Sequence, residues 1–82
     1  MGRFNIQMLP LNKRLPGILI ELKAGKNCSE VQLEALSKVA LQQINDKAYS
    51  TDLQAMGVSL ILKFGIAFSG KRTRITAETQ AI

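Results

Sequence analysis

The alternation of apolar and polar residues begins at the first residues of the chain and predicts two strands. Apolar side chains alternate in Phe4, Ile6 and Met8, and a second alternating run, GILIELKA, begins at Gly17. Alternation with a period of two residues is typical of strands. The segment LPLNKRLPG contains two prolines and a glycine, which predicts a loop between them. We therefore expect a hairpin with a long connection.

A period of three to four residues replaces this alternation after Ser29 and predicts a helix. Ser29 and Gln32 have the spacing of a capping box at the helix start. A break is expected at residues 49–51, followed by a short turn that Gly57 ends. The apolar positions that form one stripe of this amphipathic helix are Leu33, Leu36, Val39, Ala40 and Ile44.

Alternation returns in SLILKFGIAF, which predicts a third strand. The residues that share one face of it are Leu60, Leu62, Phe64, Ile66 and Phe68. Residues 69–71 predict a tight hairpin turn, Arg72 to Thr76 a final edge strand, and ETQAI a loose end. The result is an α/β (α+β) fold of strand, strand, helix, strand and strand, in which one main amphipathic helix covers a small mixed sheet. The other face is expected to be open to self-association, as in a homo-oligomer (dimer), or to a missing segment.

Composition limits the chemistry that this chain can perform. Its 82 residues make a single small domain, 1–82, and its net charge of +5 suits a polyanionic partner such as DNA. The absence of histidine and the single cysteine, Cys28, exclude an internal disulfide, a Cys/His zinc site and His-dependent nucleophilic catalysis. No leader or run long enough to span a bilayer is recognised, so we expect a cytoplasmic protein with no membrane partner.

An acid and an amine lie on one face of the second predicted strand. Glu21 and Lys23 are two residues apart and share that face with Leu19. If the first two strands pair, Asn5 comes close to both charges. A carboxylate, an amide oxygen and an amine suit a divalent cation held by oxygen ligands, with the lysine orienting a water or stabilising developing negative charge. The alternative is a solvated outer face, since E-x-K occurs by chance in most proteins.

Other polar residues have both a functional and an ordinary interpretation. Gln43 adjoins the apolar stripe of the helix and Tyr49 follows six residues later, on roughly the opposite side of an unbroken helix. Either can be an ordinary boundary or packing residue. Five basic residues of the loops and the last hairpin could contact phosphates or form a solvated surface: Lys13, Arg14, Lys71, Arg72 and Arg74.

Four ordered segments of the chain are GRFN, PGILIELKA, ALQQINDKAY and ILKFGIAFSGKR. They resemble the PD-(D/E)XK nuclease superfamily and, more narrowly, the nuclease-like domain at the C-terminal end of AAA-ATPase-like proteins. The resemblance covers residues 2 to 76, or roughly all but the ends of the chain. It implies a restriction endonuclease-like core, a central mixed sheet flanked by helices, and magnesium-dependent hydrolysis of phosphodiesters.

The resemblance also implies roles for individual residues. Asn5 and Glu21 would hold Mg²⁺ or Mn²⁺, Lys23 would position or activate the attacking water, and Gln43 would be an accessory catalytic residue. Four residues are expected to contact nucleic acid. The resemblance implies Arg3 and Tyr49, and the basic last hairpin suggests Lys71 and Arg72.

Two departures from the family pattern change what we expect of this chain. The family has an aspartate where this chain has Asn5, so a hard-cation site loses one negative charge. The chain also begins at the G-R strand, without the preceding helix and strand of the fold or an ATPase-like region. We therefore expect a truncated nuclease-like hydrolase with a weakened or inactive site, acting on DNA or RNA. The alternative is a non-catalytic remnant that is oligomeric or binds nucleic acid.

Overall fold

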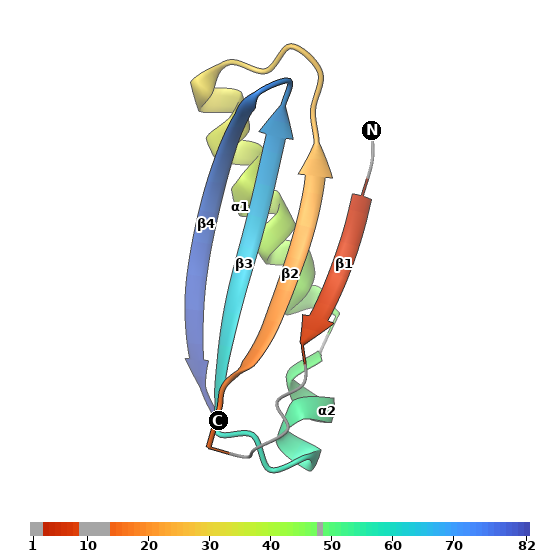
Figure 1. Cartoon of the computed structure of the whole chain (residues 1–82), viewed down its shortest axis with the longest axis vertical. Coiled ribbons are helices and arrows are strands. Elements are labelled where there is room, and N and C mark those ends of the chain that lie inside the picture. Colours follow the sequence, from red (N-terminus) through yellow and green to blue (C-terminus); the bar gives the residue numbers. More distant parts are fainter. Residues whose placement is uncertain (1–2, 9–13, 48) are drawn as a thin grey trace.

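The computed structural model describes residues 3–8, 14–47 and 49–82. In these ranges a four-stranded sheet lies in front of helix α1, with a short helix α2 at one end (Figure 1). The predicted order of strands and helix is confirmed. The predicted short turn is helix α2, but residues 49–51, where the break is expected, already belong to this helix. The elements are β1 (Arg3–Met8), β2 (Gly17–Ala24), α1 (Glu30–Asp46), α2 (Tyr49–Ala55), β3 (Leu60–Ser69) and β4 (Arg72–Ala81).

The strands lie side by side in the order β1-β2-β3-β4. The pairs β1–β2 and β3–β4 are antiparallel, whereas β2 and β3 are parallel. A parallel pair needs a long crossover connection, and α1 provides it. The sheet is therefore mixed and the fold is α+β, as the sequence pattern predicts. Part of the predicted loop after β1, residues 9–13, lies outside the described residues.

Strand β4 is longer than the sequence pattern suggests. It pairs with β3 over its whole length, from Arg72 opposite Ser69 to Ala81 opposite Leu60. The expectation that ETQAI is loose is therefore wrong for residues 78–81. The physical reason is the hydrogen-bond ladder with β3, and this segment includes Thr79, a residue type that favours strands.

Helix α1 begins at the predicted capping box and ends just before Lys47. The Ser29 side chain accepts a hydrogen bond from the Gln32 N–H at 3.2 Å, and Gln32 Oε1 accepts one from the Ser29 N–H at 2.8 Å. Lys47 is the C-cap of the helix. After α2, Gly57 has a φ of 84°, which favours glycine and confirms the predicted stop.

The stripe of α1 that packs on the sheet differs in one position from the prediction. Val39 is 45% exposed, so its placement in the stripe is wrong. Ser37 is buried instead, because its hydroxyl forms a 2.6 Å hydrogen bond with the Thr76 hydroxyl on β4. The main apolar cluster between helices and sheet consists of Leu19, Ile44, Leu53, Val58 and Ile61.

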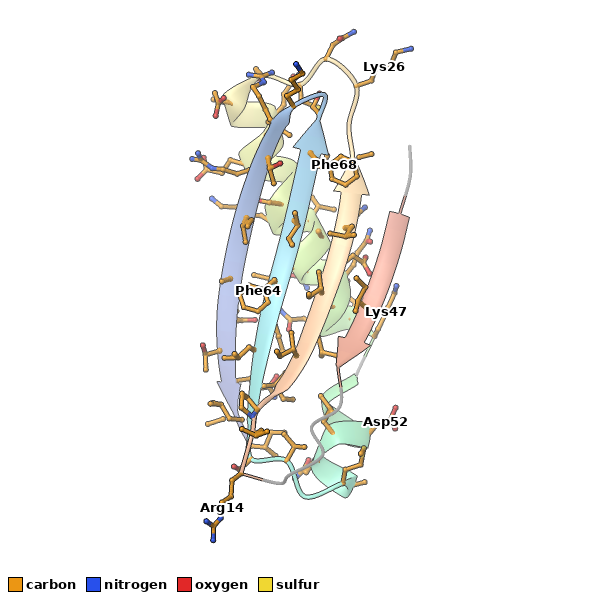
Figure 2. All side chains as sticks on the ribbon, in the orientation of Figure 1. Arg14, Lys26, Lys47, Asp52, Phe64 and Phe68 are labelled. Atoms are coloured by element: carbon orange, nitrogen blue, oxygen red, sulfur yellow. The ribbon has the colours of Figure 1, made fainter. Side chains whose placement is uncertain are left out.

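The face of the sheet that α1 covers is less apolar than the other face. Its buried residues on β2 and β3 are Gly17, Leu19, Glu21, Lys23, Ile61, Lys63, Gly65, Ala67 and Ser69. We call the other side the open face; its partly exposed residues on these strands are Ile18, Ile20, Leu22, Ala24, Leu62, Phe64, Ile66 and Phe68. Phe64 and Phe68 lie over the strands in Figure 2, and α1 runs behind them. The predicted open face is confirmed within the described part of the chain.

Gly65 allows α1 to approach the sheet closely. A Cβ atom at this position would lie 2.2 Å from the Ser37 carbonyl oxygen and 2.5 Å from the Leu41 backbone nitrogen. A glycine is therefore required here for space, because both of these atoms belong to the helix backbone. Gly65 is the Cα partner of Glu21, so the close approach occurs at the level of the charged residues.

Candidate functional site

The pairing of β1 with β2 brings the predicted site positions together. Asn5 is the Cα partner of Glu21, and Arg3 is the partner of Lys23. Residues directly opposite each other in an antiparallel pair lie on the same face of the sheet. The predicted proximity of position 5 to Glu21 is therefore confirmed at the level of the backbone. The side chains of Arg3 and Asn5 fall outside the described residues.

Glu21 and Lys23 lie on the face of the sheet that α1 covers, and both are largely shielded from bulk solvent. Glu21 is 0% exposed and Lys23 is 9% exposed. The interpretation of this strand face as a solvated outer surface is therefore wrong. A buried carboxylate is strongly destabilising unless a cation and hydrogen bonds compensate its lost hydration. The environment of Glu21 must supply that compensation.

Lys47 supplies a positive charge to Glu21, and the sequence interpretation did not include it. Its Nζ donates a hydrogen bond to Glu21 Oε1 at 3.2 Å. The Lys47 side chain is 33% exposed, so it connects solvent with the buried carboxylate. Figure 2 shows Lys47 on the side of the sheet where β1 lies. Its spacing was an available signal: Lys47 follows Gln43 by four residues, which places both on one side of a helix.

Gln43 brings an oxygen atom that accepts no hydrogen bond from the described residues. Its Oε1 is buried. Gln43 lies one turn before Lys47 and therefore on the side of α1 that faces β2. Asn45, about half a turn away, bonds to Glu78 of β4 on the other side. Buried carbonyl oxygens normally have a hydrogen-bond partner, so an unsatisfied one fits a site that holds a cation or an ordered water.

The oxygen atoms of this site suit a hard divalent cation in type, but the site has little negative charge. A carboxylate from Glu21 and amide oxygens from Gln43 and position 5 are ligands of the kind that Mg²⁺ prefers. Within the described ranges, no group of three Asp, Glu, His or Cys side chains could hold a metal. Lys23 and Lys47 carry two positive charges against the single negative charge of Glu21. Like charges repel, so two ammonium groups near Glu21 oppose the binding of a cation there.

The Lys23 ammonium has no hydrogen-bond or ion-pair partner within the described part of the chain. It follows Glu21 by two residues on the same covered face. An amine that makes no bond to these described residues is available to a ligand or a water molecule. This arrangement suits the stabilisation of negative charge at a reacting phosphate.

A second polar cluster occupies the same face between β3, β4 and α1. Lys63 Nζ donates hydrogen bonds to Asn45 Oδ1, at 2.6 Å, and to Gln80 Oε1. Glu78 Oε2 lies 4.0 Å from the same nitrogen and accepts a hydrogen bond from Asn45 Nδ2 at 3.0 Å. The Lys63 ammonium is thus surrounded by oxygen acceptors. We assign this cluster to the attachment of α1 to the sheet.

The other predicted nucleic-acid contacts lie apart from Glu21. Lys71 is exposed in the turn between β3 and β4. Arg72 donates a hydrogen bond to the Cys28 carbonyl and pairs with Glu30 at 3.3 Å. No contact in the described ranges joins Lys71 or Arg72 to Glu21. Tyr49 is the first residue of α2, and its side chain lies outside the described residues, as does Lys13. Their contact with nucleic acid stays a prediction.

Comparison with known families places this geometry in a wider context. The family model that matches the chain is that of the PD-(D/E)XK nuclease superfamily, and the match covers residues 1–78. All the site positions described above fall within it. Neither a curated protein nor a solved structure gives a significant match. Among the described residues, neither helix has the length and apolar character needed to cross a membrane.

Proposed function

Because this chain belongs to the PD-(D/E)XK nuclease superfamily, we propose that it is a nuclease-like domain whose metal-dependent hydrolysis of phosphodiesters is weakened by Asn5. The observation that carries the proposal is the register that places Asn5 opposite the buried Glu21. Nucleases of this superfamily generally use divalent metals. We propose Mg²⁺ or Mn²⁺ as the ion and DNA as the substrate; the association with an AAA-ATPase-like region stays a prediction.

Each polar residue of the covered face would have its own role in such a site. Asn5 and Glu21 would hold the ion, with Gln43 as an accessory residue that contributes its buried oxygen. A bound divalent cation would neutralise charge on the scissile phosphate and activate a water molecule. Lys23 would orient that water or stabilise the negative charge that develops on the phosphate. Helix α1 excludes bulk water from Glu21, which strengthens each of these interactions.

Asn5 accounts for the proposed weakness of the site. An asparagine side chain offers a neutral oxygen where a carboxylate would bring a full negative charge, and the number of charged ligands helps to set the affinity for a hard cation. The loss matters more here because Lys23 and Lys47 already make the site positive. Arg3, Tyr49, Lys71 and Arg72 are proposed to contact the nucleic acid.

Cleavage of plasmid DNA by three forms of the chain tests this proposal. In Mg²⁺ or Mn²⁺ we expect little or no nicking by the natural chain, clear nicking by Asn5→Asp, and none by Asn5→Asp combined with Glu21→Gln. The glutamine retains the shape of Glu21 and removes its charge, so it is a matched control. Single-stranded DNA and RNA are assayed in parallel. A folded Asn5→Asp variant that cleaves none of these substrates would overturn the proposal.

The open face favours a second function, that of a non-catalytic oligomeric module. Apolar positions cross the sheet in rows: Ile6 is opposite Ile20, Ile20 is opposite Phe64, and Ile66 is opposite Ile75, which is 56% exposed. Strands of this length and spacing make a face of roughly 500 Å². Two such faces together would bury about 1,000 Å², the lower limit for a specific interface. We propose that a second copy of the chain covers this face.

The oligomeric state of two apolar-to-acidic variants tests the second function. Ile75→Glu places a charge on the open face, whereas Val39→Glu makes the same kind of change on the exposed side of α1. By light scattering after size exclusion, we expect a dimer for the natural chain and for Val39→Glu, and a monomer for Ile75→Glu. A monomeric natural chain at high concentration would contradict self-association through this face.

A further inference from the structure

The Lys47 ammonium lies 3.2 Å from the carboxylate of Glu21, on which the proposed metal site depends. We infer that Lys47 is a built-in counter-ion, which competes with a divalent metal for Glu21 and thereby limits metal loading. This inference rests on the proposed function and adds to it a residue that regulates the site.

The burial of Glu21 explains why a counter-ion is needed. Glu21 is 0% exposed, and Lys47 Nζ lies 3.2 Å from its Oε1. A buried carboxylate without a nearby cation is strongly destabilising. In most metal sites the ion itself supplies that charge. Here Lys47, the C-cap of α1, supplies a positive charge to Glu21.

Charge explains why the ammonium and a metal exclude each other. Glu21 has one negative charge, whereas Lys23 and Lys47 have one positive charge each. A divalent cation beside Glu21 would meet the Lys47 ammonium at short range in a partly dehydrated site, where repulsion between like charges is strong. Either the Lys47 ammonium moves away from Glu21 or the metal binds weakly.

The position of Lys47 allows its ammonium to leave. Lys47 is the C-cap of α1, after the last helical residue Asp46, and its side chain is 33% exposed. A lysine side chain is long and flexible, so its charge can turn into solvent while the backbone stays in place. Lys63 differs in this respect, because its side chain is 8% exposed and is bonded to Asn45 and Gln80.

Calorimetric titration with Mg²⁺ and Mn²⁺ tests the competition directly. The background is Asn5→Asp, which carries the proposed metal ligand, and Lys47→Ala is added to it. The matched control is Lys38→Ala, which removes one positive charge from an exposed ion pair with Glu34 on the same helix. We expect Lys47→Ala to raise metal affinity by about tenfold, on the scale by which ligand charge tunes such sites. Lys38→Ala is expected to change it by less than about twofold.

Thermal unfolding without metal gives a readout that is independent of catalysis. In a chelator, we expect Lys47→Ala to lower the melting temperature and Lys38→Ala to leave it nearly unchanged. Added metal should raise the melting temperature of the Lys47→Ala variant by more than it raises that of the Asn5→Asp chain in which Lys47 is retained. In a Glu21→Gln background the effect of Lys47→Ala should largely vanish, because no buried charge remains to be paired. If Lys47→Ala does not fold, Lys47→Gln keeps most of the side chain and removes the charge.

The possible outcomes separate the inference from the proposed function. Equal metal affinity in the Lys47 and Lys38 variants would overturn the inference and leave the metal site standing. Loss of metal binding in the Lys47 variant would also overturn it, since Lys47 would then support the ion. No metal binding in any folded variant, including Asn5→Asp alone, would overturn the proposed metal site and the inference with it.

Discussion

Lys23 and Lys63 are both buried on the covered face of the sheet, yet their surroundings differ. Lys63 Nζ is bonded to the side-chain oxygens of Asn45 and Gln80 and lies within 4.0 Å of Glu78. Lys23 has no such contact in the described part of the chain. The carboxylate two residues before it on β2 is bonded to Lys47 instead.

The difference separates a lysine that is bonded to neighbouring elements of the fold from one that has no partner among the described residues. A buried ammonium with several acceptors is compensated for its lost hydration and fixes the elements that provide those acceptors. A buried ammonium without acceptors is a net cost to stability. Costs of this kind are concentrated at functional sites. The comparison therefore supports a role for Lys63 in attaching α1 and a role for Lys23 at the reacting group.

The largest effect is expected from Gly65→Ala, which would disturb both clusters at once. The new Cβ would lie within 2.5 Å of two backbone atoms of α1, so the helix has to move away from the sheet. We expect a loss of about 3 kcal/mol or more in the free energy of unfolding, measured in urea. Gly70→Ala is the control: Gly70 has a φ of 62° in an open turn, and its substitution should cost about 1 kcal/mol. Equal losses would contradict the close packing of α1 at Gly65.

The next largest effect is expected from Lys63→Ala. It removes the shared donor of the second cluster and leaves a gap beneath α1, which should destabilise the fold by about 2–3 kcal/mol. Lys63→Met retains most of the volume and should cost less. Both are measured by chemical unfolding. If Lys63→Ala is as stable as the natural chain, Lys63 has no structural role and the contrast with Lys23 fails.

The smallest effect on stability is expected from Lys23→Ala. No bond within the described residues is lost, so the free energy of unfolding should change by less than about 1 kcal/mol. In the Asn5→Asp background, however, the same change should abolish DNA cleavage while metal affinity is kept or raised. A stability loss as large as that of Lys63→Ala, with cleavage intact, would reverse the assignment of the two lysines.

The arrangement of the elements could be predicted from the sequence because each has a clear local signal. Alternation marked the strands, and the capping box of Ser29 and Gln32 marked the start of α1. The pairing of β1 with β2 then placed Asn5 opposite Glu21. These features depend on residues that are close in the sequence or on a single hairpin. The local pattern of residues is therefore enough to predict them.

The covered face could not be identified from the apolar pattern alone. The large apolar residues of β3, such as Phe64, belong to the open face, whereas α1 packs on Gly65 and Ala67. Close packing of a helix on a sheet favours small residues in the strand beneath the helix. The pattern of hydrophobic residues does not reveal such close packing. Alternating small residues in the second half of β3 were the available signal.

The charged contacts could not be predicted because they join distant parts of the chain. The Lys47–Glu21 pair spans 26 residues, and the Asn45–Glu78 hydrogen bond spans 33. Glu78 lies in the segment that the sequence pattern predicts to be loose. Contacts of this kind depend on the crossover of α1 and on the register of β4, which are set only in the folded chain.

Calorimetric titration of Mn²⁺ into the natural chain and Asn5→Asp tests the central claim most directly, namely that Asn5 weakens a metal site at Glu21. Asn5→Asp combined with Glu21→Gln is the control. We predict that Asn5→Asp binds Mn²⁺ at least about tenfold more tightly than the natural chain, because it restores one charged ligand. The control should lose that gain. Equal binding by the natural chain and a folded Asn5→Asp variant would contradict the claim.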